Sequence, residues 1–306
     1  MSSADPSSSS AAFIRAREAT GRDTTYPPLP SALVVPVYDN HTHLEISDGD
    51  EPLDYLEQLD RASSVGVRGV VQVGTDLETS RWSAEQAMHE PRMLAAVALH
   101  PNDAPEYAEA GGLDAALAEI AELAAWPRVR AVGETGLDFY RTTSDEGRAQ
   151  QQRSFEAHIE IAKDNGIALQ IHDRDAHREV IETLLRVGAP ERTVFHCFSG
   201  DAEMARICSE NGWYMSFAGN ITFKNAGDLR EALEVAPRSR IMVETDAPYL
   251  TPAPYRGRPN APYLVPYTLR FMADHLGTDV SMLAAQISSN TELVYGRWED
   301  DPVEAS

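Results

Sequence analysis

The chain has 306 residues, 42% of them hydrophobic, so it can bury a core of ordinary size. Its formal net charge of −22, from 26 Lys and Arg against 48 Asp and Glu, excludes broad, non-specific adhesion to nucleic acid, although a substrate held by one end stays compatible. No run of 18 apolar residues exists, which excludes a membrane span. With two cysteines and no secretory signal, we expect a cytoplasmic protein without a disulfide framework.

The two ends of the chain differ in composition from its middle. Residues 1–30 are Ser-rich and then Pro-rich, which predicts a disordered tail. The tail cations Arg15, Arg17 and Arg22 could touch an acidic partner, but a mobile tail is the favoured interpretation. Residues 299–306 are predicted to form a short acidic tail, which leaves residues 31–298 as a single domain.

Short apolar runs of strand type alternate with patterns of helical period along this domain. The runs cover residues 33–38, 67–73, 93–99, 129–132, 168–171, 193–195, 213–217 and 240–243. The helical patterns cover residues 53–64, 113–125, 147–165, 177–187, 202–211, 229–235, 263–276 and 280–295. Glycines that suit a left-handed helix end occur at Gly66, Gly166, Gly188 and Gly212.

Eight strand–helix units in a chain of this size predict a (β/α)8 TIM barrel. The runs are almost continuously apolar, as expected for strands that are covered on both faces. The alternative is an open, doubly wound sheet. Polar motifs lie at the C-terminal ends of strands one, four, five, six and eight, and they favour the barrel, because a closed barrel brings these ends around one mouth.

Two of these motifs contain candidate metal ligands that could share one ion. His41 and His43 are two residues apart at the end of the first strand, so both imidazoles point the same way on an extended chain. Asp39 lies close enough in sequence to orient an imidazole. Glu134 follows the fourth strand, and the two oxygens of its carboxylate could bridge two cations.

The remaining candidate ligands end later strands. His172 and His196 would complete a second ion site beside a bridging carboxylate. Asp246 ends the last strand, where its carboxylate could bind the first ion and take a proton from the attacking water. Glu244 shares the face of Asp246 and is expected to support the site, whereas Cys197 is expected to point away from it. Each ligand alone has an ordinary structural explanation, but their shared position favours a metal site.

Further residues near the mouth could hold an anionic substrate, because guanidinium groups suit phosphate oxygens. The candidates for substrate binding are His100, Arg141, Arg174, Lys224, Arg256 and Arg258. Ordinary solvated loop charge is the alternative interpretation for each cation. Tyr140 and Tyr255 lie beside two of these arginines and could stack on a terminal base.

In combination the motifs resemble the TatD-like metal-dependent deoxyribonucleases, a branch of the amidohydrolase superfamily, over residues 37–294. The resemblance is carried by Asp39-x-His-x-His-Leu44, Leu99-His-Pro101, Gly133-Glu-Thr-Gly-Leu-Asp138, His172-x-Arg-Asp-Ala176, His196-Cys-Phe-Ser199, Glu244-Thr-Asp-x-Pro-Tyr-Leu250 and Arg256-Gly257. The chain departs from the family pattern at Ala98, where glycine is often found, and at Asp173, where a hydroxyl residue is common. Asp173 adds negative charge beside the mouth.

The resemblance implies a barrel with two divalent metal ions, which could be zinc, manganese, iron or magnesium. It implies that one ion is held by His41, His43, Glu134 and Asp246, and the other by Glu134, His172 and His196. Asp246 is then the catalytic carboxylate in the hydrolysis of single-stranded or frayed DNA from its 3′ end by a monomer. Two alternatives stay open: an amide or aminoacyl-ester hydrolase with the same binuclear site, and a non-catalytic metal-binding scaffold.

Overall fold

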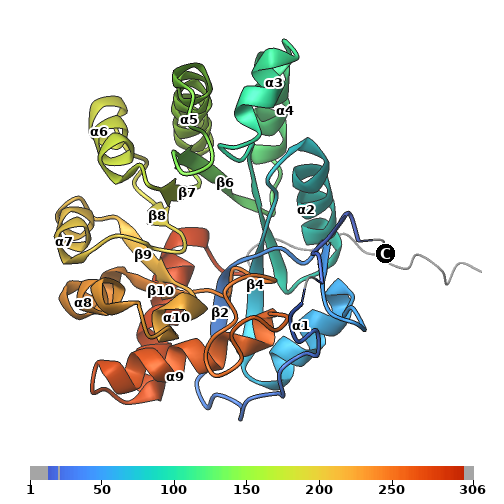
Figure 1. Ribbon diagram of the computed structural model, residues 1–306, viewed down its shortest axis with the longest axis vertical. Helices are drawn as coiled ribbons and strands as arrows, with labels where there is room; N and C mark the ends of the chain where they lie inside the picture. Colours follow the sequence, from blue (N-terminus) through green and yellow to red (C-terminus); the bar gives the residue numbers. More distant parts are fainter. Residues whose placement is uncertain (1–12, 20, 300–306) are drawn as a thin grey trace, which may run out of the picture.

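The computed structural model describes residues 13–19 and 21–299, which form a (β/α)8 barrel (Figure 1). Eight parallel strands pair with their neighbours in chain order. These are β2 (Val37–Thr42), β4 (Val67–Val73), β5 (Met93–Val97), β6 (Val129–Asp138), β7 (Ala168–Arg174), β8 (Thr193–Phe195), β9 (Tyr214–Phe217) and β10 (Ile241–Val243). A parallel bridge between Thr42 and Ala247 joins the end of the first of these strands to the loop that follows the last. The open-sheet alternative is therefore excluded.

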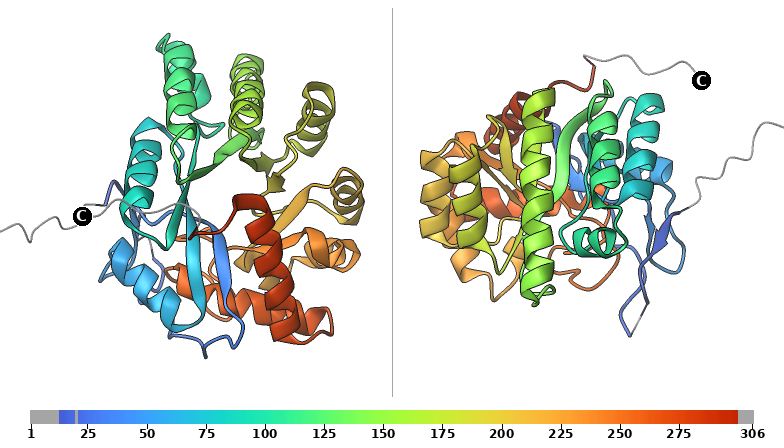
Figure 2. Two further views of the ribbon diagram at one scale, coloured as in Figure 1. Left: turned by 180° about the vertical axis from the view of Figure 1, so that it is seen from behind. Right: turned by 90° about the horizontal axis from the view of Figure 1, so that it is seen from above.

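Helices surround the strands on the outside (Figures 1 and 2). They are α1 (Tyr55–Ser64), α2 (Leu77–His89), α3 (Ala104–Glu109), α4 (Leu113–Ala124), α5 (Asp145–Asn165), α6 (His177–Val187), α7 (Ala202–Glu210), α8 (Gly227–Val235), α9 (Val265–His275) and α10 (Val280–Tyr295), with 3-10 turns η1 (Gly219–Thr222), η2 (Arg238–Arg240) and η3 (Pro262–Leu264). Seen from behind, α10 crosses in front of the strands (Figure 2). No helix in the described part of the chain is long and apolar enough to span a membrane.

Local sequence signals set the ends of several helices. Asp76 and Thr79 form a reciprocal capping box at the start of α2, and Ser144 caps α5 by accepting a hydrogen bond from a backbone N–H. The glycine expected to end α5, Gly166, has a φ of +60°, and the other three predicted cap glycines also have positive φ. The helices α2 and α3 lie outside the ranges that the periodicity predicts.

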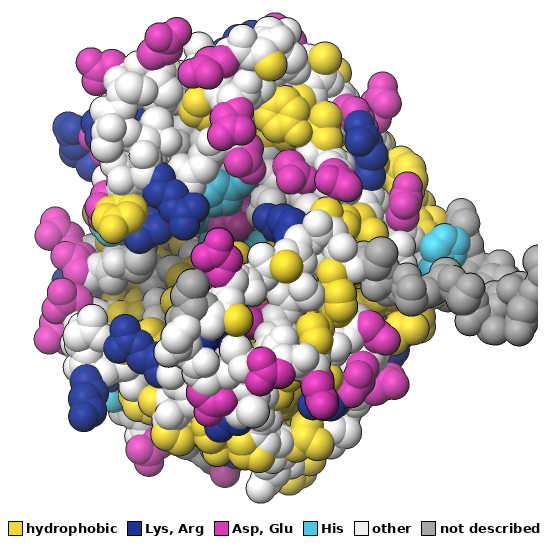
Figure 3. Space-filling model, turned by 45° about the vertical axis from the view of Figure 1, so that its right-hand side comes forward, with side chains coloured by type: hydrophobic (Ala, Val, Ile, Leu, Met, Phe, Trp, Pro, Cys, Tyr) yellow, Lys and Arg dark blue, Asp and Glu magenta, His cyan; other side chains and the backbone are white. Residues whose placement is uncertain are grey.

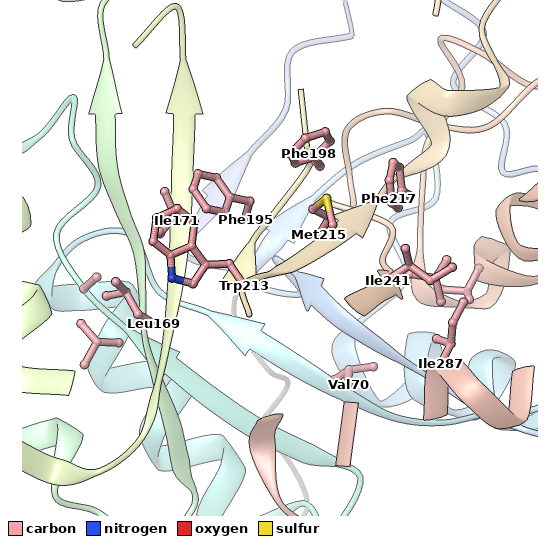
Figure 4. Packing of buried hydrophobic residues seen from close by; sticks show 14 of the residues in the cluster. Val70, Leu169, Ile171, Phe195, Phe198, Trp213, Met215, Phe217, Ile241 and Ile287 are labelled. Atoms are coloured by element: carbon pink, nitrogen blue, oxygen red, sulfur yellow. The ribbon is translucent and has the colours of Figure 1, made fainter. Parts of the chain in front are cut away.

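The core has two parts, because alternate strand residues face opposite sides of the barrel wall. Side chains such as Val70, Leu169 and Ile171 belong to the larger part, in which the Phe195 and Trp213 rings lie 5.8 Å apart (Figure 4). The smaller part is a separate buried cluster of alternate strand residues together with the end of α10 and Trp298. This packing holds the strand ends in place, and with them the polar motifs.

The segment before the barrel differs from the expected mobile tail. Its strand β1 (Arg15–Ala16) pairs in parallel with β3 (Ile46–Ser47), and the Tyr263 hydroxyl donates a hydrogen bond to the Pro27 carbonyl oxygen. Backbone pairing and contacts of this kind supply the stabilisation that its own composition lacks. The expectation for residues 1–12, and for nearly all of the acidic tail, lies outside the described residues.

Candidate metal centre and active site

The six predicted metal ligands meet at the C-terminal ends of the strands, which we call the mouth of the barrel. His41, Glu134 and His172 lie within β2, β6 and β7, while His196 and Asp246 lie just beyond β8 and β10. His43 follows β2 directly. Figure 3 shows histidine side chains inside a hollow on one face of the molecule, with Lys or Arg side chains at its rim. The barrel therefore brings together residues more than 200 positions apart in the sequence.

Four of the ligands surround a single point. The Nε2 atoms of His41 and His43 are 3.3 Å apart. The Glu134 Oε2 atom lies 3.6 and 3.7 Å from these two nitrogens, and the Asp246 Oδ1 atom lies 3.8 and 3.6 Å from them. Ligand atoms around a tetrahedral ion with bonds of about 2.1 Å are about 3.4 Å apart, so the spacing fits a metal ion.

The hydrogen bonds of both imidazoles place the ring proton on Nδ1. The Nδ1 atoms of His41 and His43 donate to the side-chain oxygen of Gln170 at 3.1 Å and to the Val73 carbonyl oxygen at 2.9 Å. The Gln170 amide nitrogen donates to the Asn40 carbonyl oxygen, which identifies its other atom as the acceptor. Both Nδ1 atoms therefore carry the protons, and the two Nε2 lone pairs face each other unless a cation or a proton lies between them.

The pKa values of the two histidines shift in opposite directions. Burial, followed by the neighbouring His196, lowers the pKa of His41. Burial also opposes protonation of His43, but nearby carboxylates, Asp246 first, outweigh it and raise the pKa of His43. The carboxylates of the buried Glu134 and the partly buried Asp246 thus favour a positive charge between them, either a proton or a metal ion.

Glu134 connects this group of ligands to a second one. Its other oxygen, Oε1, lies 2.6 Å from His172 Nδ1, 2.8 Å from His196 Nε2 and 3.5 Å from His100 Nε2. Burial opposes ionisation, but the histidines, His196 first, hold the pKa of Glu134 well below its usual range. The carboxylate is therefore ionised and directs one oxygen to each group, as a bridging ligand would.

Further residues orient the predicted ligands, and sequence reasoning assigned this role to Glu244 but not to Asp138 or Gln170. Glu244 Oε1 lies 3.3 Å from His196 Nδ1, as its expected supporting role requires. Asp138 Oδ2 lies 3.2 Å from His172 Nε2, and Gln170 orients His41. A signal for Gln170 exists in the sequence, because it is two residues before His172 and shares its face of the strand.

Two expectations about neighbouring residues are wrong. Asp39 does not orient an imidazole: it accepts hydrogen bonds from the Thr245 backbone N–H at 2.9 Å and from the Thr245 hydroxyl, and burial raises the pKa of Asp39 to about 8. Cys197 does not point away from the site but lines a cavity with Glu134 and Asp246. Its φ of +40° ends the extended backbone, so strand alternation no longer predicts its direction.

Backbone contacts place Asp246. Its φ of +52° lies in the left-handed region, which is unfavourable for a residue other than glycine and is found disproportionately at functional sites. The Asp246 N–H donates to the His41 carbonyl oxygen at 3.0 Å, and the Asp246 carbonyl oxygen accepts from the Tyr249 N–H at 2.8 Å. These two bonds hold the turn that directs the carboxylate towards the histidines.

Two adjoining cavities open from the predicted metal ligands. The first, of about 350 Å³, contains His43 and His100, and the second, of about 380 Å³, contains His196 and Cys197. Both are lined by Glu134, His172, Arg174, Asp246 and Leu250. A substrate that spans both cavities would lie directly over the Glu134 carboxylate.

The predicted substrate-binding residues divide into two groups. His100 and Arg141 line the first cavity, and Arg174 lines both, with its guanidinium 3.9 Å from the centre of the Tyr140 ring. The others, Lys224, Arg256 and Arg258, line neither cavity. Lys224 is exposed, Arg256 stacks on Phe223, and Arg258 donates hydrogen bonds to the Thr25 and Tyr26 carbonyl oxygens.

The unusual Asp173 is partly neutralised. Its carboxylate lies 2.8 Å from His177 Nδ1, and this hydrogen bond raises the pKa of His177. The extra negative charge beside the mouth therefore has a local partner.

Comparisons with known proteins agree on one family. The family described as TatD related DNase matches residues 38–296. The uncharacterized metal-dependent hydrolase TatD of Mycobacterium tuberculosis is 43% identical and covers 84% of this chain and 97% of its own. The 3′-5′ ssDNA/RNA exonuclease TatD of Escherichia fergusonii is 35% identical, with coverages of 77% and 90%. The crystal structure of YJJV, a TatD homologue from Escherichia coli K12, has a TM-score of 0.74 at 25% identity and covers 85% of this chain and 97% of its own.

Proposed function

The chain belongs to the TatD family of metal-dependent hydrolases, and we propose that it is a phosphodiesterase that removes nucleotides from the 3′ ends of single-stranded or frayed DNA. The observation that carries the proposal is the position of Glu134, whose two oxygens face two separate groups of ligands. A relative named as a 3′-5′ exonuclease, 35% identical, supports the polarity.

The ligand set suits two divalent metal ions. His41, His43, Glu134 and Asp246 would hold one, and Glu134, His172 and His196 the other. Mixed nitrogen and oxygen donors fit zinc, manganese or iron, and magnesium fits less well. When bound, the ions supply Lewis-acid chemistry that lowers the pKa of water and stabilises negative charge on phosphoryl oxygens.

The residues of the chain have distinct parts in this reaction. Asp246 is within reach of the same point as the two Nε2 atoms and accepts the proton of the attacking water. Arg141 and Arg174, at the cavity walls, hold the phosphate oxygens. The exposed Tyr140 ring, already stacked on Arg174, offers a surface for the terminal base.

The proposal is tested on single-stranded DNA labelled at its 3′ or its 5′ end. The protein is stripped of metal and reloaded with zinc, manganese or magnesium, and metal content is measured alongside cleavage. We expect metal-dependent loss of the 3′ label first, and a fall of about a thousandfold in rate for Asp246→Asn, because the proton acceptor is removed.

The matched control is Asp274→Asn, an exposed aspartate on α9, which should cleave at the wild-type rate. A chain that binds two ions and leaves DNA intact would refute the nuclease proposal. The metal-loaded protein would then be tested on amide and aminoacyl-ester substrates.

A further inference from the structure

We propose that Arg15 is a specificity-determining residue that binds a phosphate of the substrate next to the one being hydrolysed; this inference rests on the proposed phosphodiesterase function. Arg15 belongs to the N-terminal segment, by which we mean residues 13–19 and 21–30. The family match begins at residue 38, so this segment lies outside the matched region.

The N-terminal segment is fixed against the mouth by its backbone. The Ile14 N–H donates to the Glu45 carbonyl oxygen at 3.0 Å, and the Arg17 N–H donates to the Ser47 carbonyl oxygen at 2.9 Å. These bonds form the β1–β3 pairing on both sides of Arg15. The position of the Arg15 backbone is therefore set by the loop that follows the ligands of β2.

Side chains hold the same segment from two directions. Arg17 and Arg22 both form ion pairs with the buried carboxylate of Asp48. The Arg17 guanidinium also lies over the Tyr249 ring, 5.2 Å from its centre, and Tyr249 lines the first cavity. The segment thus forms part of the wall of the mouth.

The Arg15 side chain is held in one orientation, but some of its N–H groups have no partner among the described residues. It pairs with the buried Glu45 carboxylate and donates from Nη1 to the Thr75 hydroxyl at 3.0 Å. A guanidinium has five N–H donors, and these two contacts leave a second N–H on each of Nη1 and Nη2, whereas the unpartnered Nε is itself buried. The side chain is 35% exposed and lines the first cavity with His43 and Asp246. The remaining N–H groups can therefore donate hydrogen bonds to an anion while the contacts with Glu45 and Thr75 stay in place.

Charge and position identify the ligand as a phosphate. The first cavity is also lined by the carboxylates of Asp103 and Asp138, so an anionic substrate needs cations there. Arg15 lines the first cavity but not the second, whereas Arg174 lines both. Arg15 thus lies towards one end of the hollow, where a neighbouring phosphate of the same strand would pass, and its planar fork matches two phosphate oxygens.

The test pairs a substitution in the enzyme with one in the substrate. Wild type, Arg15→Gln and Arg153→Gln are compared on oligothymidylates in which the phosphate next to the terminal linkage is either intact or a neutral methylphosphonate. Arg153 is an exposed arginine on α5 that pairs with Asp114, so its variant loses the same charge away from the mouth.

We expect Arg15→Gln to lower kcat/KM on the intact strand by about tenfold, the effect of one charged hydrogen-bonding contact. On the methylphosphonate strand the variant and wild type should be equal. The slope of log binding constant against log salt should become shallower by about 0.7 in Arg15→Gln and stay unchanged in Arg153→Gln. A ribo-oligonucleotide arm shows whether the contact serves DNA, RNA or both.

Equal losses on the two strands would overturn the inference, because they indicate a structural role for Arg15. Failure of the nuclease proposal is recognised separately, by wild type that cleaves neither strand. In that case the binding of the dinucleotide pTpT to the metal-loaded full chain is measured by calorimetry. Weaker binding by Arg15→Gln than by Arg153→Gln supports the inference, whereas equal binding, or no binding by wild type, overturns it.

Discussion

At the scale of single residues, the proton positions on the histidines determine what the site can bind. The Nδ1 atoms of His41 and His43 are committed to Gln170 and to a backbone carbonyl group, which directs both lone pairs to one point. A histidine without such a partner could present either nitrogen. The direction of the two lone pairs therefore depends on the Gln170 and Val73 oxygens as much as on the histidines themselves.

A buried histidine behind the site makes folding sensitive to pH. His158 Nε2 accepts from the Leu99 N–H at 3.2 Å, Nδ1 lies 2.9 Å from the Thr135 hydroxyl oxygen, and burial lowers the pKa of His158 to about 4. In the unfolded chain the pKa of His158 is about 6.5. Between these values the unfolded state binds more protons, so stability falls as pH falls from 6.5 to 4, by roughly 3 kcal/mol in all.

The measurement is urea unfolding between pH 4 and pH 7.5. His158→Gln should be less stable than wild type at pH 7.5 but should lose less stability on acidification. His89→Gln, at an exposed position at the end of α2, should follow the wild-type pH dependence. Parallel curves for wild type and His158→Gln would contradict the assignment.

At the scale of elements, the close approach of β6 and β7 places Glu134 beside His172. Gly133 and Gly136 permit this close approach of the two strands. A Cβ atom on Gly133 would lie 2.5 Å from the Gln170 Cβ, and one on Gly136 would lie 2.0 Å from the His172 carbonyl oxygen. Gly136 also has a φ of +141°, which other residues rarely adopt.

Gly136→Ala is therefore expected to lower the free energy of unfolding by about 2 kcal/mol or more, because backbone atoms have to move. Metal affinity should fall with it, since His172 shifts. Gly227→Ala is the matched control: this glycine begins α8, and a Cβ there meets no atom within 4 Å. Urea unfolding and metal titration of both variants measure the difference, and equal stability would argue against the close approach.

At the scale of the whole molecule, the N-terminal segment and the barrel are joined by contacts distant in sequence. Arg258 donates hydrogen bonds to the Thr25 carbonyl oxygen, the Thr25 hydroxyl and the Tyr26 carbonyl oxygen, each at 2.8 Å. An arginine that the sequence places among substrate-binding candidates thus holds the segment that carries Arg15.

Arg258→Gln is expected to loosen the N-terminal segment and leave the barrel intact. Limited proteolysis with mass spectrometry should show faster cleavage between residues 13 and 30, while the unfolding midpoint of the barrel changes little. Arg256→Gln is the control, because that side chain stacks on Phe223 and does not contact the segment through any described hydrogen bond. Equal cleavage rates in the two variants would contradict the anchoring role of Arg258.

The sequence by itself was sufficient for the architecture and for which polar residues meet at the mouth of the barrel. Alternating apolar runs and helical periods are local properties, and eight units of them predict the barrel that the structure has. Strand β4 begins and ends where its apolar run does. The position of His41 and Asp246 follows from the same patterns, because parallel strands end at one mouth and the residues at those ends must meet. Their role as metal ligands stays a prediction.

Only the tertiary structure decided which side chains complete the site. Gln170 on β7 contacts His41 on β2, which is not a neighbouring strand, and Asp138 contacts His172 from the adjacent strand. Cys197 turns towards the cavity where the strand geometry ends. Arg15 lies in a segment whose composition predicts disorder, yet pairing with β3 and with Asp48 orders its surroundings. Loop directions and long-range pairings of this kind depend on contacts between residues distant in sequence, which local periodicity does not record.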